Sequence, residues 1–183
     1  MRTTRSLELV TVEDYLRGEL ESEIWHEYVA EVVYALTNRT NAHGKIAMNC
    51  VASMHSQLSG GSCDAFRFRC KDPHQTRFCF PDMSITRELN SDSNLFQDRP
   101  VVIIAVLSDT TCRTDEEEKR ETYQSIASLN HYVLLEQFAA AGIVYRRSDS
   151  TWEQQVMTGP EVRLSHKTRS NRSLGATSEM TVE

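Results

Sequence analysis

Hydrophobic residues recur with two different spacings along this chain, and the spacing predicts where helices and strands lie. Apolar positions at helical spacing cover residues 11–21 and 41–58, and a charged segment over residues 115–126 predicts a third helix. Strands are predicted at residues 25–29, 31–36, 63–71, 77–86 (interrupted at Pro81), 101–107, 132–135, 143–147 and 152–157. This order of elements favours a mixed α/β (α+β) fold, in which a mixed β-sheet is flanked by helices.

Some of the predicted strands also indicate their surroundings. Residues 101–107 (VVIIAVL) are apolar throughout, which is typical of a central strand that is covered on both faces. In residues 63–71 the phenylalanines alternate with arginines, so we expect a half-exposed strand with a basic outer face. We expect exposed apolar strand edges near Val144 and Val156, and such edges are compatible with a homodimer.

The length and composition narrow the class of protein. The 183 residues suit one domain, which we expect over residues 1–164, followed by a polar, mobile C-terminal tail over residues 165–183. Twenty Lys and Arg residues against 26 Asp and Glu residues give a formal net charge of −6, which argues against a surface that is basic throughout but allows a local basic groove. No apolar stretch is long enough to span a membrane, and the five cysteines form no C-x-x-C pair, so we expect a soluble cytoplasmic protein with reduced thiols.

The strongest candidate for chemistry is the segment FPDMSI at residues 80–85. Asp82 follows Pro81 beside an apolar strand run, and Lys119 lies on the helix predicted after the next strand. Hydrolysis of a phosphodiester needs oxygen ligands for a divalent cation, an oriented water and a positive charge near the transition state. Asp82, a neighbouring acid and Lys119 could supply these groups. Alternatively, Asp82 only begins a turn after the proline.

Motifs in a fixed order extend this interpretation over residues 15–157. They are His26-Glu27-Tyr28-Val29 with Glu31-Val32-Val33-Tyr34-Ala35, Ala42-His43 with Ile46, Phe80-Pro81-Asp82-Met83, VVIIAVLSDTT at residues 101–111, Asp115 with Lys119 and Tyr123, and SLNHYVL at residues 128–134. Each motif is weak alone. In this order and spacing they resemble the Uma family of restriction-endonuclease-like proteins, members of the PD-(D/E)XK nuclease superfamily.

The resemblance implies a fold, a reaction and a set of site residues. The fold is a restriction-endonuclease-like mixed sheet with acids at a strand end. The reaction is metal-dependent endonucleolytic hydrolysis of DNA, with one or two Mg²⁺ (or Mn²⁺) ions as cofactor. Carried over to this chain, Asp82 is the central metal ligand, Glu27 is an outer acidic ligand or supports one, and Lys119 polarises the attacking water.

The sequence departs from the family pattern at three positions. The acid of the central strand is replaced by Ala105, which removes a carboxylate ligand and weakens the binding of a hard cation. Asp109, where the family has Pro, either restores a metal ligand or caps a turn. Ala30 replaces the Asp of the ribbon turn and no Gly follows it, so we expect a different turn.

Basic residues near these motifs are candidates for contacts with nucleic acid. Arg67, Arg69 and Arg77 form a phosphate-binding face or are ordinary solvated residues. His43, at a helix start, contacts an anion or plays a structural role. Two functions therefore stay open: an endonuclease with an incomplete catalytic set, and an inactive nuclease-fold protein that binds nucleic acid or a partner. DNA is the expected partner, and RNA is not excluded.

Overall fold

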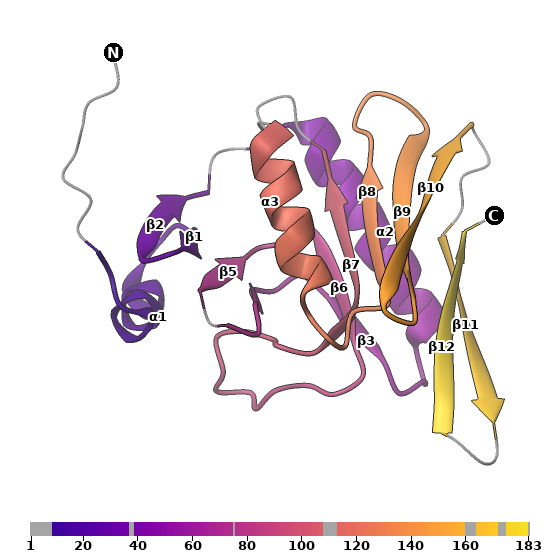
Figure 1. The fold of residues 1–183 in the computed structure, drawn as a ribbon, viewed down its shortest axis with the longest axis horizontal. Helices are drawn as coiled ribbons and strands as arrows, with labels where there is room; N and C mark the ends of the chain where they lie inside the picture. The colour runs from indigo at the N-terminus through magenta and orange to yellow at the C-terminus, as the bar shows by residue number, and fades with distance from the viewer. Residues whose placement is uncertain are drawn as a thin grey trace.

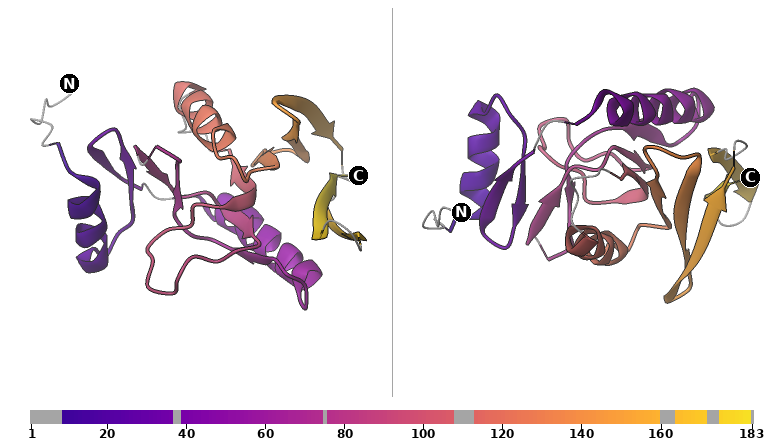
Figure 2. Two further views of the ribbon diagram at one scale, coloured as in Figure 1. Left: turned by 60° about the horizontal axis from the view of Figure 1, so that its bottom comes forward. Right: turned by 90° about the horizontal axis from the view of Figure 1, so that it is seen from above.

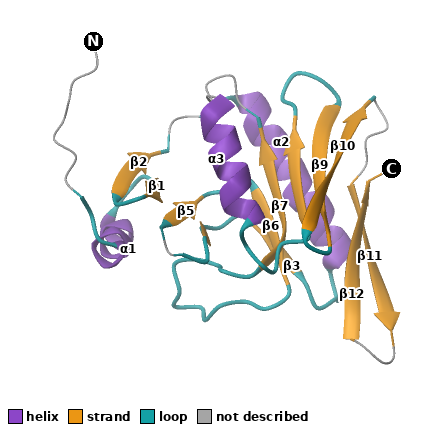
Figure 3. Cartoon of the chain, viewed as in Figure 1, coloured by secondary structure: helices purple, strands orange, loops and turns teal. Residues whose placement is uncertain are grey.

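The structure, a computed structural model, describes residues 9–36, 39–74, 76–107, 113–159, 164–171 and 175–182. Its helices are α1 (Val12–Glu21), α2 (Asn41–Leu58) and α3 (Arg113–Gln124). Its strands are β1 (His26–Val29), β2 (Val32–Ala35), β3 (Asp64–Phe66), β4 (Cys70–Lys71), β5 (Arg77–Cys79), β6 (Met83–Thr86), β7 (Pro100–Val106), β8 (His131–Leu135), β9 (Ala141–Ser148), β10 (Thr151–Thr158), β11 (Leu164–Asn171) and β12 (Gly175–Val182). The predicted mixed α/β fold is confirmed (Figures 1 and 3).

The larger sheet has six strands in the order β10-β9-β8-β7-β6-β3. The β7–β8 pair is parallel and the other pairs are antiparallel. Two parallel neighbours need a crossover, and α3 lies between β7 and β8 in the chain and supplies it. Helices α2 and α3 lie on opposite faces of this sheet (Figure 2).

Strand β7 is covered on both faces, as its apolar run predicts. Val102, Ile104 and Val106 belong to the core under α2, where Met54 is buried. Ile103 and Ala105 face the other core, which contains Tyr123 of α3 and Tyr132 of β8. The alternation of a strand therefore assigns position 105 to the face that α3 covers.

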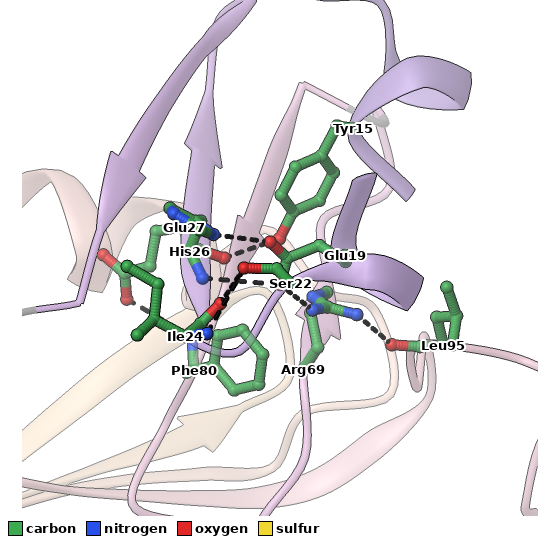
Figure 4. A network of polar contacts seen from close by, with 9 residues as sticks. All are labelled: Tyr15, Glu19, Ser22, Ile24, His26, Glu27, Arg69, Phe80 and Leu95. Carbon is green, nitrogen blue, oxygen red and sulfur yellow. Dashed lines mark hydrogen bonds and ion pairs between the residues drawn. The ribbon is translucent and has the colours of Figure 1, made fainter. Parts of the chain in front are cut away.

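A smaller sheet, β2-β1-β5-β4, forms a separate layer on which α1 packs. Tyr15 of α1 stacks on Tyr28 with ring centroids 5.0 Å apart, and its hydroxyl donates to the His26 carbonyl at 2.7 Å. Glu19, at the other end of α1, accepts hydrogen bonds from the His26 ring and from the Arg69 guanidinium (Figure 4). These contacts fix β1, the strand that carries Glu27.

The two sheets are joined by the short segment between β5 and β6. Strand β5 pairs with β1 in the small sheet, and β6 pairs with β7 in the large one. The strand break predicted at Pro81 is therefore confirmed: a proline cannot donate to a ladder, and the chain changes sheets at this point.

The single strand predicted over residues 63–71 is wrong. Strand β3 pairs with β6 in the large sheet, whereas β4 pairs with β5 in the small sheet. The residues between them cross from one sheet to the other. As a result, Arg69 is buried and does not lie on a basic outer face.

The β1–β2 ribbon closes through a two-residue turn, in which Ala30 has φ 46° and Glu31 has φ 69°. Two consecutive residues in the left-handed region are typical of a type I′ turn, which prefers Asn-Gly. An L-residue with a β-carbon is strained there by ~1 kcal/mol or more. The turn is therefore compact and retains an unfavourable sequence, and the different turn expected from Ala30 stays a prediction.

The C-terminal strands β11 and β12 pair with each other as an antiparallel hairpin. The domain boundary at residue 164 and the mobile tail stay predictions.

Val144 is buried, so the exposed edge expected there is wrong, whereas Val156 on the outer strand β10 is exposed. The homodimer stays a prediction.

Two further expectations concern thiols and membranes. The described cysteines, Cys50, Cys63, Cys70 and Cys79, are free thiols, as expected. Among the described residues, no helix combines the length and the apolar character that crossing a membrane requires.

The strained turn leads to a stability prediction. Replacing Ala30-Glu31 with Asn-Gly is expected to raise the free energy of unfolding by about 1 kcal/mol, because both new residues tolerate positive φ. Urea denaturation measures the change. Ala52→Gly, at an exposed position of α2, is the control and is expected to lower stability by up to about 1 kcal/mol. A loss of stability in the Asn-Gly variant would contradict the turn geometry.

Candidate functional site

Asp82 lies in the segment that joins the two sheets, and the residue is only 3% exposed. Its Oδ1 accepts hydrogen bonds from Nη1 of Arg39 and, at 2.9 Å, from Nε2 of His43. Its Oδ2 accepts from the backbone N–H of Val106 on β7 at 2.8 Å. Both carboxylate oxygens are therefore engaged by donors of the protein itself.

The two side-chain donors come from the start of α2. Thr40 is the N-cap of this helix, and its hydroxyl accepts from the His43 N–H at 3.1 Å. This cap directs His43 inward, where it is buried, and places Arg39 just before the helix. Nη2 of Arg39 also donates to the Phe80 carbonyl at 3.4 Å, so this guanidinium spans the strand junction.

Burial, followed by the positive charges of Arg39 and Arg67, lowers the pKa of His43 to about 4. His43 is therefore neutral at pH 7. Because Asp82 can only accept, we assign the imidazole proton to Nε2. The buried Nδ1 then has no hydrogen-bond partner within the described residues.

Glu27 and Lys119 meet beside this group. The Lys119 ammonium of α3 lies 3.0 Å from Oε2 of Glu27. Oε1 of Glu27 accepts from the Phe80 N–H at 3.3 Å, a contact drawn in Figure 4. The pKa of Arg39 is lowered, chiefly by burial, and the nearby Glu27 carboxylate opposes this shift. Glu27, Lys119 and the Asp82 cluster therefore share one neighbourhood at the rim of the sheets.

Ala105 lies where the resemblance requires the missing acid. It is the neighbour of Val106, whose N–H binds Asp82, and it faces α3. Lys119 lies one helical turn before Tyr123, which packs in the same core. A carboxylate at position 105 would point toward the face that α3 covers, on the side of Lys119. The alanine has only a methyl group there and cannot bind a metal ion.

The arginines predicted to contact nucleic acid differ in their surroundings. Arg69 is internal: its guanidinium binds Glu19 at 2.5 Å and the Leu95 carbonyl at 2.7 Å. Arg77 is partly exposed and pairs with Glu118 at 3.0 Å. Arg67 is exposed and lies over the Trp25 ring. Asp109 lies outside the described residues.

Sequence reasoning missed Arg39. A single arginine in a linker has no pattern that distinguishes it from a solvated residue, and only the fold brings it to Asp82, 43 positions along the chain.

The described residues do not fit a divalent metal ion. No three His, Cys, Asp or Glu side chains among them come together as a ligand group. Both oxygens of Asp82 and both oxygens of Glu27 already bind protein donors. With His43 neutral, and counting only residues that the structure describes, the cations Arg39, Arg67 and Lys119 outnumber the carboxylates of Asp82 and Glu27 by one. A hard cation prefers an excess of anionic oxygens, so this charge balance favours an anion.

Comparison with known proteins agrees with this architecture. The model of the Uma2 family, described as "Putative restriction endonuclease", matches residues 12–176. A crystal structure described as "a putative nuclease belonging to DUF820 from Anabaena variabilis" has a TM-score of 0.64 and 18% identity, over 83% of this chain and 86% of that one. Comparison with curated proteins finds no match. The chain therefore belongs to the Uma2 family and has the fold of that nuclease-like structure.

The depressed pKa of His43 predicts how stability depends on pH. Between about pH 6.5, the pKa of an unfolded histidine, and pH 4, the unfolded chain binds a proton that the folded chain does not. Stability is therefore expected to fall as the pH falls through this window, by as much as about 3 kcal/mol. Urea denaturation at several pH values measures the loss.

Two histidine variants serve as controls for this prediction. His43→Gln should flatten the pH profile, whereas His55→Gln, at an exposed position of α2, should leave it unchanged. Identical profiles for His43→Gln and the unmodified chain would show that His43 does not carry the effect.

Proposed function

We propose that this Uma2-family protein binds the phosphates of nucleic acid at the Asp82 site without a divalent metal and does not hydrolyse them. The observation that carries the proposal is the Arg39 guanidinium on the Asp82 carboxylate. It occupies the position beside the central acid where the family resemblance implies a metal ion. The family membership supports nucleic acid as the class of ligand.

An arginine can replace one property of a metal ion but not the others. It carries a positive charge and offers donors that match a phosphate in a bidentate way. It cannot hold a water as a Lewis acid does, and its pKa is too high for it to act as a base at neutral pH. A site built on Arg39 therefore supports phosphate binding and lacks a means of activating water.

The cations of the site differ in how freely they can meet a phosphate. Lys119 is held by Glu27, and Arg39 is held by Asp82. Within the described residues, Arg67 forms no ion pair with a carboxylate, so it offers the most available charge. The formal charge of the whole chain is −6, so we expect binding of moderate strength at this local positive site.

Metal-dependent endonucleolytic cleavage is the second candidate. The meeting of Glu27 and Lys119 beside Asp82 favours it, because these are the three residues for which the resemblance implies catalytic roles. It requires that Arg39 leave Asp82 and that a further carboxylate replace the one missing at Ala105. This candidate and the binding function differ in their response to metal and to substitution of Asp82.

The proposal predicts binding in the absence of metal. A fluorescent single-stranded DNA is expected to bind in EDTA, with a slope of log K against log salt of about −1.4 if two phosphates are neutralised. Plasmid and single-stranded DNA are expected to stay uncut with Mg²⁺ or Mn²⁺. Asp82→Asn should keep or increase the affinity for DNA, because it removes a negative charge. In a metal-dependent nuclease the same substitution would abolish cleavage.

The control for this comparison is Asp92→Asn, at an exposed loop position, which should change neither measurement. Brisk cleavage that depends on Mg²⁺ and disappears in Asp82→Asn would overturn the binding proposal in favour of the second candidate.

A double substitution tests the charge argument directly. Arg39→Ala combined with Ala105→Glu removes the cation at Asp82 and adds the missing acid. It is expected to increase Mn²⁺ affinity by at least about tenfold in calorimetry, since even residues that only support metal ligands change affinity by ~10–100-fold. The control, Arg39→Ala with Ala52→Glu, adds the same charge at an exposed position of α2 and should not increase the Mn²⁺ affinity. Equal Mn²⁺ affinity in the two variants would contradict the proposed role of position 105.

A further inference from the structure

Four side chains beside the Asp82 site form a column in which cations and aromatic rings are in contact. The Arg69 guanidinium lies 4.6 Å from the centroid of the Phe80 ring. The Trp25 ring stacks on Phe80, with centroids 4.9 Å apart and an interplanar angle of 12°. The Arg67 guanidinium lies 5.2 Å from the centroid of the Trp25 ring. We call these four residues the Trp25 column.

The column runs from the interior to the surface. Arg69 and Phe80 are buried, Trp25 is 47% exposed, and Arg67 is exposed. The inner members are held from several sides: Arg69 by Glu19 and the Leu95 carbonyl, and Phe80 through its N–H bond to Glu27 (Figure 4). The outer end therefore presents a half-exposed indole and a guanidinium on a fixed support.

The column is adjacent to the phosphate-binding cations. The Phe80 carbonyl accepts from Arg39, so one residue belongs to both the column and the Asp82 site. Arg67 also lies close enough to Arg39 and His43 for its charge to lower the pKa of both. The outer end of the column therefore lies close to the cations that face Asp82.

We propose that the Arg67 guanidinium, supported by the Trp25 ring, is a stacking platform for an unpaired nucleobase, so that the protein prefers single-stranded nucleic acid. The inference rests on the proposed binding function and specifies its ligand. Unpaired bases stack on exposed aromatic rings and on guanidinium planes, and this contact does not depend on which base is present. Bases within a duplex have no free face for such a platform, whereas their phosphates are equally available.

The test compares ligands that carry the same phosphates with and without bases. A dT oligonucleotide and an abasic oligonucleotide of equal length are titrated in EDTA against Trp152→Phe, in which Trp25 is the remaining tryptophan. The dT strand is expected to bind on the order of tenfold more tightly than the abasic strand and to quench the Trp25 emission. A duplex of the same length should resemble the abasic strand.

Substitutions then localise the effect. Trp25→Ala should abolish the difference between dT and abasic strands, whereas Phe138→Ala, which removes an aromatic side chain that is 70% exposed, should retain it. The ligand comparison itself needs no variant of the column, so it holds even if Trp25→Ala folds poorly. Equal affinity for dT and abasic strands would overturn the subsite and leave the phosphate-binding function standing. Failure of both strands to bind would overturn the binding function and the subsite with it.

Discussion

The structure depends most on one buried carboxylate, that of Asp82, and on the three donors that satisfy it. These donors come from the segment before α2, from α2 itself and from the backbone of β7. Asp82 lies where the chain leaves the small sheet and enters the large one. A buried carboxylate without such partners would be strongly unfavourable, so its satisfaction fixes α2 against the junction of the sheets.

The interactions that stabilise this junction also occupy the carboxylates for which the family resemblance implies metal binding. A divalent metal ion in a nuclease is bound by carboxylate oxygens that are free to coordinate it. Here the carboxylates of Asp82 and Glu27 are each paired with a cation of the protein, Arg39 and Lys119 respectively. The family fold is retained, and its chemistry has to be decided from the residues at the site.

Local patterns predicted much of the fold because they reflect local constraints. Helix α2, the β1–β2 ribbon and the apolar β7 all follow from short-range spacing, whereas the N-cap of α2 is Thr40 and was not predicted. The division of residues 63–71 between two sheets was missed, because phenylalanines and arginines alternate in the same way whichever sheet each half joins. The burial of Arg69 depends on Glu19, 50 positions away, which no local pattern contains. The meeting of Glu27 and Lys119 was predicted only by the family resemblance.

Phe80 connects the two parts of the proposed ligand site. Its backbone binds Glu27 and Arg39, and its ring supports Trp25. Because Pro81 follows it and Asp82 is anchored to β7, the ring and the carboxylate are held in one fixed relation. A phosphate at the Asp82 cations and a base at the outer end of the Trp25 column would therefore be positioned by one rigid segment. Such preorganisation lowers the entropic cost of binding a flexible single strand, which an acidic protein needs more than a basic one does.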